Sequence, residues 1–322
     1  MVSNDSSLST NKNLRIVIAS AISSIHPGAG RSPGIVDLPV IRDPMGYFYI
    51  PGSELKGALK TSAAIRHKDG CINGDKINCK ECQLVCCLLG GEVGEGHEAP
   101  SRLSVGDLYP LLIPVPSLSH GFLYATSPLL ISRAKALINV ASQDNIGKLI
   151  EWLETGVKEL EYETDVVLMG AENSGQLYLT LTRVQPKNVA EKLENDVIDI
   201  LENIHPVYRL HNLNGNTVIV SDALLPMIIE RALIRLTRVR LSRTTKTVTT
   251  GSLWTEEYIP HITLFVGYIA DTKYEGKYCG NRDIQDAVNE LKNIMGASDN
   301  IINLVIGGKE SIGKGLLRLY IA

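Results

Sequence analysis

The sequence contains no apolar run of the roughly 18 residues that a membrane-spanning helix requires. Residues 1–13 are polar and lack the apolar centre of a signal peptide. We therefore expect a cytoplasmic protein without a membrane partner. An excess of positive charge is also missing, because 32 Lys and Arg residues stand against 35 Asp and Glu residues, giving a formal net charge of -3. Binding to nucleic acid would consequently need a local basic surface.

The length of 322 residues and the hydrophobic content of 44% suffice for a substantial core in one large domain or two small ones. No internal repeat divides the chain. Near the start, the alternating β-branched segment 14–20 predicts a strand, and a glycine-rich loop follows from His26. Periodicity and caps predict further elements: a short strand at 47–50, helices at 54–67, 144–161, 188–202, 221–235 and 281–295, and a last strand before a glycine loop. This order indicates an α+β fold.

We expect a flexible tail at residues 1–13, followed by a single domain from 14 to 322. The domain carries three predicted insertions, at about residues 67–101 (rich in Cys), 139–211 (helical) and 239–254 (a β-hairpin). The hairpin is predicted because residues 239–254 alternate around a polar centre, which places Thr244–Lys246 at the tip.

Five of the six cysteines lie between Cys71 and Cys87, in the pattern C-x7-C-x2-C-x3-C-C. In a reducing cytoplasm such a cluster favours metal ligation, because thiolates two residues apart can chelate one Zn²⁺. The predicted ligands of a structural Zn²⁺ are Cys71, Cys79, Cys82 and Cys86, with Cys87 as an alternative to Cys86. The same cluster is compatible with disulfides, which occur in the cytoplasm of hyperthermophiles, and with buried thiols. Four protein ligands leave no open position, so this metal would take no part in catalysis.

Asp37 lies in a loop rich in Gly and Pro, eleven residues after His26 and five before Arg42. Its carboxylate could hold a hydrated divalent cation against a phosphate. If that phosphate belongs to RNA, the substrate supplies its own nucleophile, the 2′-hydroxyl. A positioned carboxylate or metal could then assist attack of this hydroxyl on the neighbouring phosphorus. The simpler alternative is a solvated turn residue. Histidine titrates near neutrality, so His26 is either an acid, a base or a phosphate contact, or else a structural residue beside Pro27.

Two features could bind phosphate. The string PGSELKG at the start of the helix at 54–67 presents unpaired backbone N–H groups and the positive end of the helix dipole. Ser53, Lys56 and Lys60 add donors, which predicts a phosphate cradle; a solvated helix with incidental lysines is the alternative. The second feature is the run 231–246, which has no acid and predicts one strongly basic edge. Its cations are Arg231, Arg235, Arg238, Arg240, Arg243 and Lys246.

The glycine loop near the end satisfies part of a nucleotide-binding pattern, G-x-x-x-x-G-K, between Gly308 and Lys314. Gly315 stands where that pattern needs Ser or Thr to bind Mg²⁺. Seven residues follow Gly315, too few for the helix and sheet that such a domain needs downstream. We therefore expect no ATP binding.

Three separated segments resemble a known family. They are HPGAGRSPGIVDLPVIRD with IPGSELKGALK near the start, LWTEEYIP late in the chain, and IGGKESIGKG close to the end. Together they resemble the RAMP superfamily, and within it the backbone subunit of the type III-B CRISPR effector, the Cmr complex. The His-Pro-Gly, Val-Asp-x-Pro-x-x-Arg and Pro-Gly-Ser-x-x-Lys-Gly strings are characteristic of that family. Residues 70–100 and 139–211 carry no resemblance.

The resemblance implies an RNA-recognition-motif or ferredoxin-like core, and several copies stacked along a CRISPR guide RNA beside other Cmr subunits. It implies cleavage of a complementary single-stranded target RNA at regular intervals, with Asp37 as the cleaving aspartate and Mg²⁺ or another divalent cation as cofactor. His26, Glu256 and Tyr258 are the supporting catalytic candidates, and Glu257 replaces Glu256 if the alignment shifts by one residue. A strand end with solvated acids is the alternative for this last segment.

The resemblance also implies RNA contacts. The hairpin resembles the thumb that related subunits push between guide and target strands, where it would splay a base pair. The glycine loop would let the backbone approach the guide RNA closely. The predicted RNA-binding residues are Gly28, Arg42, Ser53, Lys56, Lys60, Arg238, Arg240, Arg243, Lys246, Gly307, Gly308, Gly313 and Gly315.

Two other functions are compatible with these residues. The first is a structural backbone subunit that binds guide RNA without cutting. The second is a free-standing endoribonuclease similar to the guide-processing RAMP enzymes, which would cut precursor RNA without partners. All three predict RNA binding, so they are separated by cleavage in a reconstituted complex and by cleavage by the isolated chain.

Overall fold

The structure is a computed structural model that describes residues 13–32, 34–91, 100–141, 144–280 and 282–322. The predicted tail therefore lies, except for Asn13, outside the described residues. The elements follow along the chain as β1 (Leu14–Ala21), α1 (Gly52–His67), β2 (Ile72–Asn73), β3 (Lys76–Ile77), α2 (Gln83–Leu89), β4 (Leu103–Val105), β5 (Tyr109–Ser117), β6 (Gly121–Thr126), α3 (Pro128–Ala141), α4 (Asp144–Val157), β7 (Val166–Met169), β8 (Leu177–Leu179), β9 (Thr182–Val184), β10 (Lys187–Val189), α5 (Asn195–Ile204), α6 (Val207–Leu210), β11 (Thr217–Val220), α7 (Leu225–Ala232), β12 (Ile234–Leu241), β13 (Val248–Tyr258), β14 (Leu264–Asp271), α8 (Ala287–Met295), β15 (Ile301–Val305), a 3-10 turn (Glu310–Ile312) and β16 (Leu316–Ile321).

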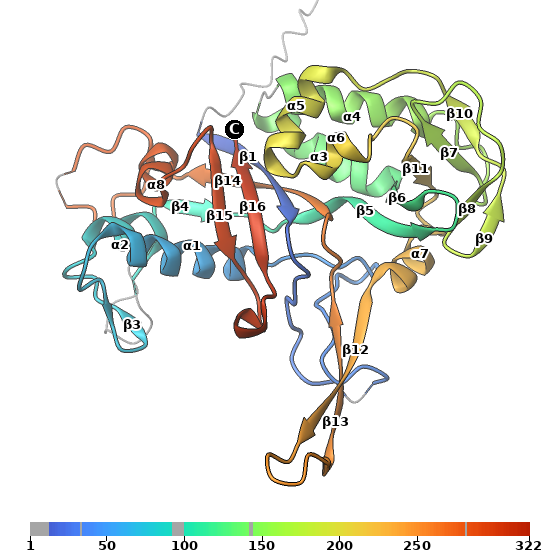
Figure 1. Ribbon diagram of the computed structural model, residues 1–322. Helices are drawn as coiled ribbons and strands as arrows, with labels where there is room; N and C mark the ends of the chain where they lie inside the picture. The colour runs from blue at the N-terminus through green and yellow to red at the C-terminus, as the bar shows by residue number, and fades with distance from the viewer. Residues whose placement is uncertain (1–12, 33, 92–99, 142–143, 281) are drawn as a thin grey trace, which may run out of the picture.

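The central sheet has the strand order β10-β7-β11-β6-β5-β14-β1-β16-β15, with β4 paired to β14 beside this path (Figure 1). Its middle part, β5-β14-β1-β16, is antiparallel throughout. Because α1 follows β1 and α8 follows β14, these strands form the β-α-β-β-α-β arrangement of a ferredoxin-like core. The predicted α+β fold is confirmed. The sheet continues past this core through β6, β11, β7 and β10.

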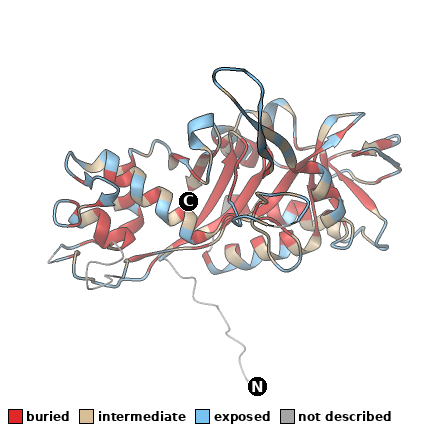
Figure 2. Ribbon diagram, turned by 90° about the horizontal axis from the view of Figure 1, so that it is seen from below, coloured by how far each residue is buried: buried red, intermediate tan, exposed pale blue. Residues whose placement is uncertain are grey.

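Helices cover both faces of the sheet, so its central strands are buried on both sides (Figure 2). Successive side chains of a strand point to opposite faces. In β1, Val17 and Ala19 join the core that includes α1, α2 and α8, whereas Ile16 and Ile18 join the core under α3, α4 and α5. Each fully buried Val or Ile contributes about 1.5–3 kcal/mol. Among the residues that the structure describes, no helix has the length and apolar character needed to cross a membrane.

The Cys-rich insertion is closed by disulfides rather than by metal. The bonded pairs are Cys71–Cys82, Cys79–Cys86 and Cys87–Cys279. The predicted ligands of zinc were Cys71, Cys79, Cys82 and Cys86, and all four are in disulfides. A sulfur in a disulfide is no longer a thiolate ligand, so the predicted zinc site is wrong in this structure. The alternative of disulfides holds instead. The spacing of the clustered cysteines could not predict this set of disulfides, because Cys87 pairs with Cys279, 192 residues away.

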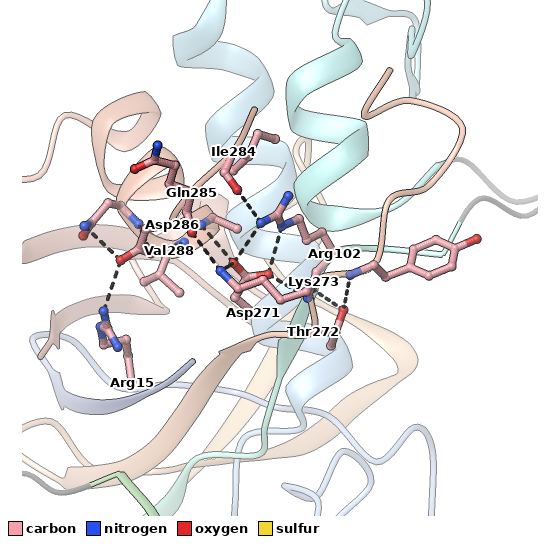
Figure 3. A network of polar contacts seen from close by, with 12 residues as sticks. Arg15, Arg102, Asp271, Thr272, Lys273, Ile284, Gln285, Asp286 and Val288 are labelled. Atoms are coloured by element: carbon pink, nitrogen blue, oxygen red, sulfur yellow. Dashed lines mark hydrogen bonds and ion pairs between the residues drawn. The ribbon is translucent and has the colours of Figure 1, made fainter. Parts of the chain in front are cut away.

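A polar network around the buried pair of Arg102 and Asp271 fastens the end of this insertion to the sheet (Figure 3). Arg102 donates to the two carboxylate oxygens of Asp271 at 2.9 and 3.2 Å, and Lys273 donates to Asp271 at 2.9 Å. Arg15 on β1 reaches Asp286, the N-cap of α8, at 3.1 Å. Burial opposes ionisation of Asp271, but the hydrogen bonds from Arg102 and Lys273 outweigh it and lower the pKa of this carboxyl. The charge pair therefore stays intact near neutral pH.

The predicted hairpin is present but longer than the range 239–254. The helix predicted at 221–235 ends at Ala232, and Ile234 already belongs to β12. Strand β13 extends to Tyr258, which pairs with Ile234. The extra length matters for function, because it brings the segment that follows Trp254 into the hairpin.

Other boundaries differ from the predictions. The helix predicted at 188–202 starts at Asn195, because residues 187–189 pair with β7 as strand β10. The segment 47–50 forms isolated bridges and no strand. The helix α3 was not predicted. The helix predicted at 281–295 begins at Ala287 in the structure, and Asn281 lies outside the described residues.

Candidate functional site

Strand β13 holds the segment that carries His26 and Asp37. Residues 26–32 and 34–42, here called the Asp37 loop, fold back on themselves through backbone hydrogen bonds. The chain here lies along β13, with Ile25 bridged to Ile259 and Leu38 bridged to Glu256. The structure therefore gathers four predicted catalytic residues around one strand: His26, Asp37, Glu256 and Tyr258.

Asp37 is exposed, and one oxygen of its carboxylate is held. Oδ2 accepts the backbone N–H of Thr255 at 2.7 Å and the Thr255 hydroxyl at 2.9 Å. The Asp37 N–H in turn donates to Thr255 Oγ1 at 3.0 Å. The backbone bond from Thr255, then its hydroxyl bond, with a smaller effect of Arg31, hold the pKa of the Asp37 carboxyl below its ordinary value. No hydrogen bond from the described part of the chain engages Oδ1, which is open to a ligand.

Asp37 lines a cavity of about 670 Å³ between the Asp37 loop, the hairpin and the glycine loop at 306–315. Arg31, Arg240 and Lys309 are cationic members of its lining, and Trp254 adds an aromatic surface. In the part of this cavity that the structure describes, cations outnumber the acid. The cavity therefore attracts an anionic ligand such as a phosphate and sets it beside a carboxylate.

His26 is buried beside β13, and a hydrogen bond selects its tautomer. Its Nδ1 lies 2.7 Å from the backbone oxygen of Glu257. A carbonyl oxygen can only accept, so Nδ1 carries the proton and Nε2 of the neutral ring is an acceptor. A Cβ at position 28 would lie 3.1 Å from Nε2, so Gly28 keeps this nitrogen uncovered on that side. Nε2 is thus the nitrogen that can accept a proton, but His26 is 6% exposed and is not among the residues that line the cavity of Asp37.

Glu256 is 1% exposed and is surrounded by donors. Lys309 Nζ and Trp254 Nε1 donate to Oε1 at 2.6 and 2.7 Å, and Arg238 Nε donates to Oε2 at 3.2 Å. The Tyr258 hydroxyl also donates to Oε2. Burial disfavours the charged form, but these donors outweigh burial and lower the pKa of Glu256 to about 2. Both oxygens are engaged within the protein, so the supporting catalytic roles of Glu256 and Tyr258 stay predictions, and the contacts in the structure are those of positioning residues.

Glu257 forms a second buried ion-pair centre. Arg42 Nη2 lies 3.1 Å from both of its carboxylate oxygens, and Arg235 Nε donates to Oε1 at 3.1 Å. Both arginines also pair with Glu230 on α7. Arg42, predicted to bind RNA, therefore has its charge compensated inside the protein. It fastens the Asp37 loop to α7 and to the hairpin, and losing either partner would leave a costly buried charge.

The glycine loop packs against the start of the Asp37 loop. The Gly308 N–H donates to the backbone oxygen of His26 at 3.0 Å, and the Gly315 N–H to that of Ser24 at 2.9 Å. A Cβ at Gly307 would lie 2.7 Å from the His26 oxygen, and the φ of Gly307 is +82°. Gly313 also has positive φ. Close approaches within the protein explain Gly307 and Gly315, and positive φ explains Gly313, so the contact of this loop with guide RNA stays a prediction.

The phosphate cradle predicted at the start of α1 is largely filled by the protein itself. The internal acceptors are Asp107 for the Gly52 N–H (2.7 Å), Ser101 for Lys56 Nζ (2.6 Å) and Gly91 for Lys60 Nζ (3.1 Å). Burial, followed by repulsion from Lys60, lowers the pKa of Lys56. A carboxylate at the positive end of the helix contradicts an open anion site there. Ser53 stays exposed, but the cradle does not form as predicted.

The hairpin projects from the body of the molecule (Figure 1), and its cations fall into two groups. Arg235 and Arg238 are paired with the buried glutamates, as described above. Arg240, Arg243 and Lys246 are exposed, and their side chains form no hydrogen bond or ion pair with the described residues. These three cations are free to meet the phosphates of a polymer, as predicted for a basic edge.

Comparison with known proteins decides the family. A model of the RAMP superfamily matches residues 18–318. This chain belongs to the RAMP superfamily. The match spans the ferredoxin-like core, the Asp37 loop, the hairpin and the glycine loop, including segments in which the sequence carried no visible resemblance.

Relatives of this RAMP protein cover nearly all of it. The CRISPR system Cmr endoribonuclease Cmr4 of Pyrococcus furiosus is 29% identical over 91% of this chain and 90% of its own length. The CMR subunit Cmr4 of Saccharolobus solfataricus is 25% identical over 93% of both chains. A chain of the type III-B Cmr-beta structure bound to cognate target RNA shares the fold, with a TM-score of 0.69 at 22% identity over 96% of each chain. Oligomeric Cmr4 from P. furiosus gives 0.60 at 19% identity, over 97% of this chain and 99% of its own.

This RAMP protein offers a divalent cation few ligands. Within the described ranges, no three His, Cys, Asp or Glu side chains group as a metal site. Glu256 and Glu257 are saturated by internal donors, which leaves Asp37 Oδ1. Mg²⁺ commonly binds through one or two carboxylates together with water and substrate phosphates. The donor set therefore fits a cation that arrives with the RNA, and does not form a cage of protein ligands.

Members of the site that were not predicted include Thr255, Arg31 and Lys309. Thr255 is a threonine in a strand and matches no catalytic pattern, and it meets Asp37 across 218 residues of sequence. Arg31 lies inside the resembling segment HPGAGRSPGIVD, and Lys309 inside IGGKESIGKG. Charge within those two segments was the signal that could have identified both cations.

Proposed function

We propose that this RAMP protein is the backbone subunit of a type III-B CRISPR ribonucleoprotein, in which it binds guide RNA and cleaves complementary target RNA. One observation carries the proposal: Asp37 is held through one oxygen and open at the other, in a cavity lined with cations. The endoribonuclease of P. furiosus, 29% identical over most of the chain, supports the same activity. The partners would be guide RNA, single-stranded target RNA, further copies of the chain and other Cmr subunits.

The proposed reaction is a transesterification of the target RNA. A 2′-hydroxyl oxygen attacks the adjacent phosphorus, the bond to the 5′ oxygen breaks, and a 2′,3′-cyclic phosphate and a 5′-hydroxyl result. The proton of the 2′-hydroxyl goes to water, or to His26 Nε2 where the RNA reaches that buried ring, and a proton from water or from the ring goes to the leaving oxygen. Asp37, a weak base because its pKa is low, orients the reacting groups. His26 contacts β13 at Glu257 and Asp37 contacts it at Thr255, and these two positions are ~7 Å apart along the strand.

Charge near the phosphorus is the second contribution of the cavity. Arg31 and Arg240 are placed to neutralise the phosphate oxygens, and such electrostatic stabilisation is commonly the largest part of catalysis. A divalent cation, Mg²⁺ or another, would be held by Asp37 Oδ1 and would supply further positive charge to the phosphate. Lys309 adds to the positive field while it holds Glu256.

We also propose a cytoplasmic location, where guide and target RNA occur. The three disulfides are compatible with it, because intracellular proteins of hyperthermophilic archaea are known to carry disulfides. An archaeal source of that kind is part of the proposal.

Replacement of Asp37 tests the proposed function. In a complex reconstituted with the Asp37→Asn variant, we expect target binding within about twofold of wild type. Cleavage should fall by about 10²-fold or more, because the loss of a group that orients the reacting atoms costs about that much. The matched control is Asp75→Asn, in the exposed turn between β2 and β3, which should leave both unchanged. Undiminished cleavage by Asp37→Asn would remove Asp37 from the mechanism.

Cleavage by the reconstituted wild-type complex and by the isolated chain distinguishes the two alternative functions from the proposed one. A non-catalytic backbone subunit would give no cleavage by the wild-type complex. A free-standing processing enzyme would cut a repeat hairpin as an isolated chain. The proposal requires cleavage of target by the complex and none of the repeat hairpin by the isolated chain.

A further inference from the structure

Thr255 holds both the side chain and the main chain of Asp37. Its backbone N–H and its hydroxyl donate to Asp37 Oδ2, and its Oγ1 accepts the Asp37 N–H. The hydroxyl has a single proton. Its 2.9 Å contact with Oδ2 is shorter than its 3.4 Å contact with the backbone oxygen of Ile35, so the proton belongs to the bond with Asp37.

We propose that Thr255 is a positioning residue for RNA cleavage, whose hydroxyl fixes the Asp37 carboxylate so that Oδ1 stays open to the substrate. The inference rests on the proposed function of Asp37. A carboxylate on an exposed loop would otherwise sample several rotamers, and Thr255 restricts it from a strand. Because Thr255 is β-branched and strand-bound, its own hydroxyl direction is restricted in turn.

The surrounding charges give the hydroxyl an electrostatic effect as well. Arg31, Arg240 and Lys309 line the same cavity as Asp37, and the charge of Arg31 favours the ionised form of Asp37. The neighbouring acids on β13, Glu256 and Glu257, are engaged by internal cations. Without the Thr255 hydroxyl, Asp37 keeps the backbone donor and these charges, so we expect its pKa to rise only part of the way to the ordinary value.

The hairpin itself does not depend on the Thr255 hydroxyl. Thr255 faces Thr237 in the register of the β12–β13 ladder, while the main-chain N–H and oxygen of Thr255 bond to Asp37 and Leu38. Thr237 is exposed, and its side chain has no hydrogen bond with the described residues. Thr237→Val is therefore a matched control: the same change at the facing position of the same ladder, on a side chain that makes no hydrogen bond to Asp37.

The test compares Thr255→Val, Thr255→Ser and Thr237→Val in the reconstituted complex, beside Asp37→Asn. We expect Thr255→Val to lower the single-turnover rate of cleavage of bound target by about tenfold, as the loss of a hydrogen bond to a charged group does. Its Kd for target should stay within about twofold. Thr255→Ser restores the hydroxyl and should restore the rate, and Thr237→Val should match wild type.

A second readout follows the carboxyl group directly. In the full chain labelled with ¹³C at aspartate carboxyl carbons, the NMR titration of Asp37 should give a higher pKa in Thr255→Val than in wild type or Thr255→Ser. The inference is overturned if Thr255→Val cuts at the wild-type rate, or if its rate falls while the pKa of Asp37 is unchanged, or if Thr255→Ser fails to rescue.

The two proposals fail in different ways. Wild-type cleavage by Asp37→Asn overturns the proposed function and this inference with it. An inactive Asp37→Asn together with a fully active Thr255→Val overturns the role of Thr255 alone, and leaves the assignment of Asp37 intact.

Discussion

Glu256 and Asp37 are both acids in segments that resemble the RAMP active centre, and their neighbours give them different roles. Both oxygens of Glu256 are occupied, partly by Lys309 from the glycine loop, 53 residues away. Asp37 has one oxygen engaged and is exposed. Sequence motifs identified both residues, but the difference depends on partners that lie far away in sequence, so no local pattern could predict it.

Replacement of Glu256 by Gln should lower the stability of the protein at pH 7. The pKa of this carboxyl falls from the ordinary 4.5 to about 2 in the folded state. Its stabilisation is therefore present above pH 4.5 and is lost as the pH falls through about 2. From the size of the shift, wild type should exceed Glu256→Gln by about 3 kcal/mol in free energy of unfolding at neutral pH.

Denaturant unfolding at pH 7 and at pH 3 measures this difference, which should shrink at the lower pH because Glu256 is then partly protonated in the unfolded state. The control is Glu275→Gln, an exposed acid whose side chain has no hydrogen bond with the described residues. An equal loss of stability at both pH values would show that ionisation of Glu256 is not what stabilises the fold.

At the scale of elements, the hairpin shows what periodicity can and cannot decide. Ile228, Ile229 and Ala232 continue to Leu236 at helical spacing, which predicted one long helix. Residues 234–241 also alternate, as a strand does. The pairing of β12 with β13 settles the ambiguity, and this tertiary contact lies outside any sequence window.

The exposed cations of the hairpin should contribute to RNA binding through counterion release. For the combined variant Arg240→Ala, Arg243→Ala and Lys246→Ala, we expect weaker binding of RNA by the complex. The slope of log affinity against log salt should become shallower by about 2, at about 0.7 for each lost contact with a single-stranded phosphate. The measurement is an RNA titration at several salt concentrations.

Lys158→Ala is the control for this variant, since Lys158 is exposed just after α4 and far along the chain from the hairpin. Its salt slope should equal that of wild type. A triple variant with an unchanged slope would mean that the hairpin cations do not contact phosphates in the complex.

At the scale of the whole molecule, the site needs distant parts of the chain. The Asp37 loop follows β1, Thr255 lies on β13 and Lys309 precedes β16; in the central sheet β1 pairs with β16. The order of elements was enough to predict the α+β core. The packing of the insertions was not predictable, because it depends on long-range contacts such as the Cys87–Cys279 disulfide.

That disulfide should contribute more to stability than the local one between Cys79 and Cys86. In the chain-entropy model, the closed loops of 192 and 7 residues correspond to about 5 and about 2 kcal/mol. The double variant Cys87→Ala with Cys279→Ala should therefore show the larger fall in Tm by calorimetry under oxidising conditions. A larger fall for Cys79→Ala with Cys86→Ala would contradict the model.

The central claim is that the Asp37 carboxylate carries out cleavage within the assembled ribonucleoprotein. Its most direct test is the single-turnover rate at which complexes containing Asp37→Asn cut target RNA that is already bound, relative to complexes containing Asp75→Asn. The account predicts a rate lower by about 10²-fold or more at equal occupancy, because the reacting groups lose their orientation. Equal rates in the two complexes would contradict it.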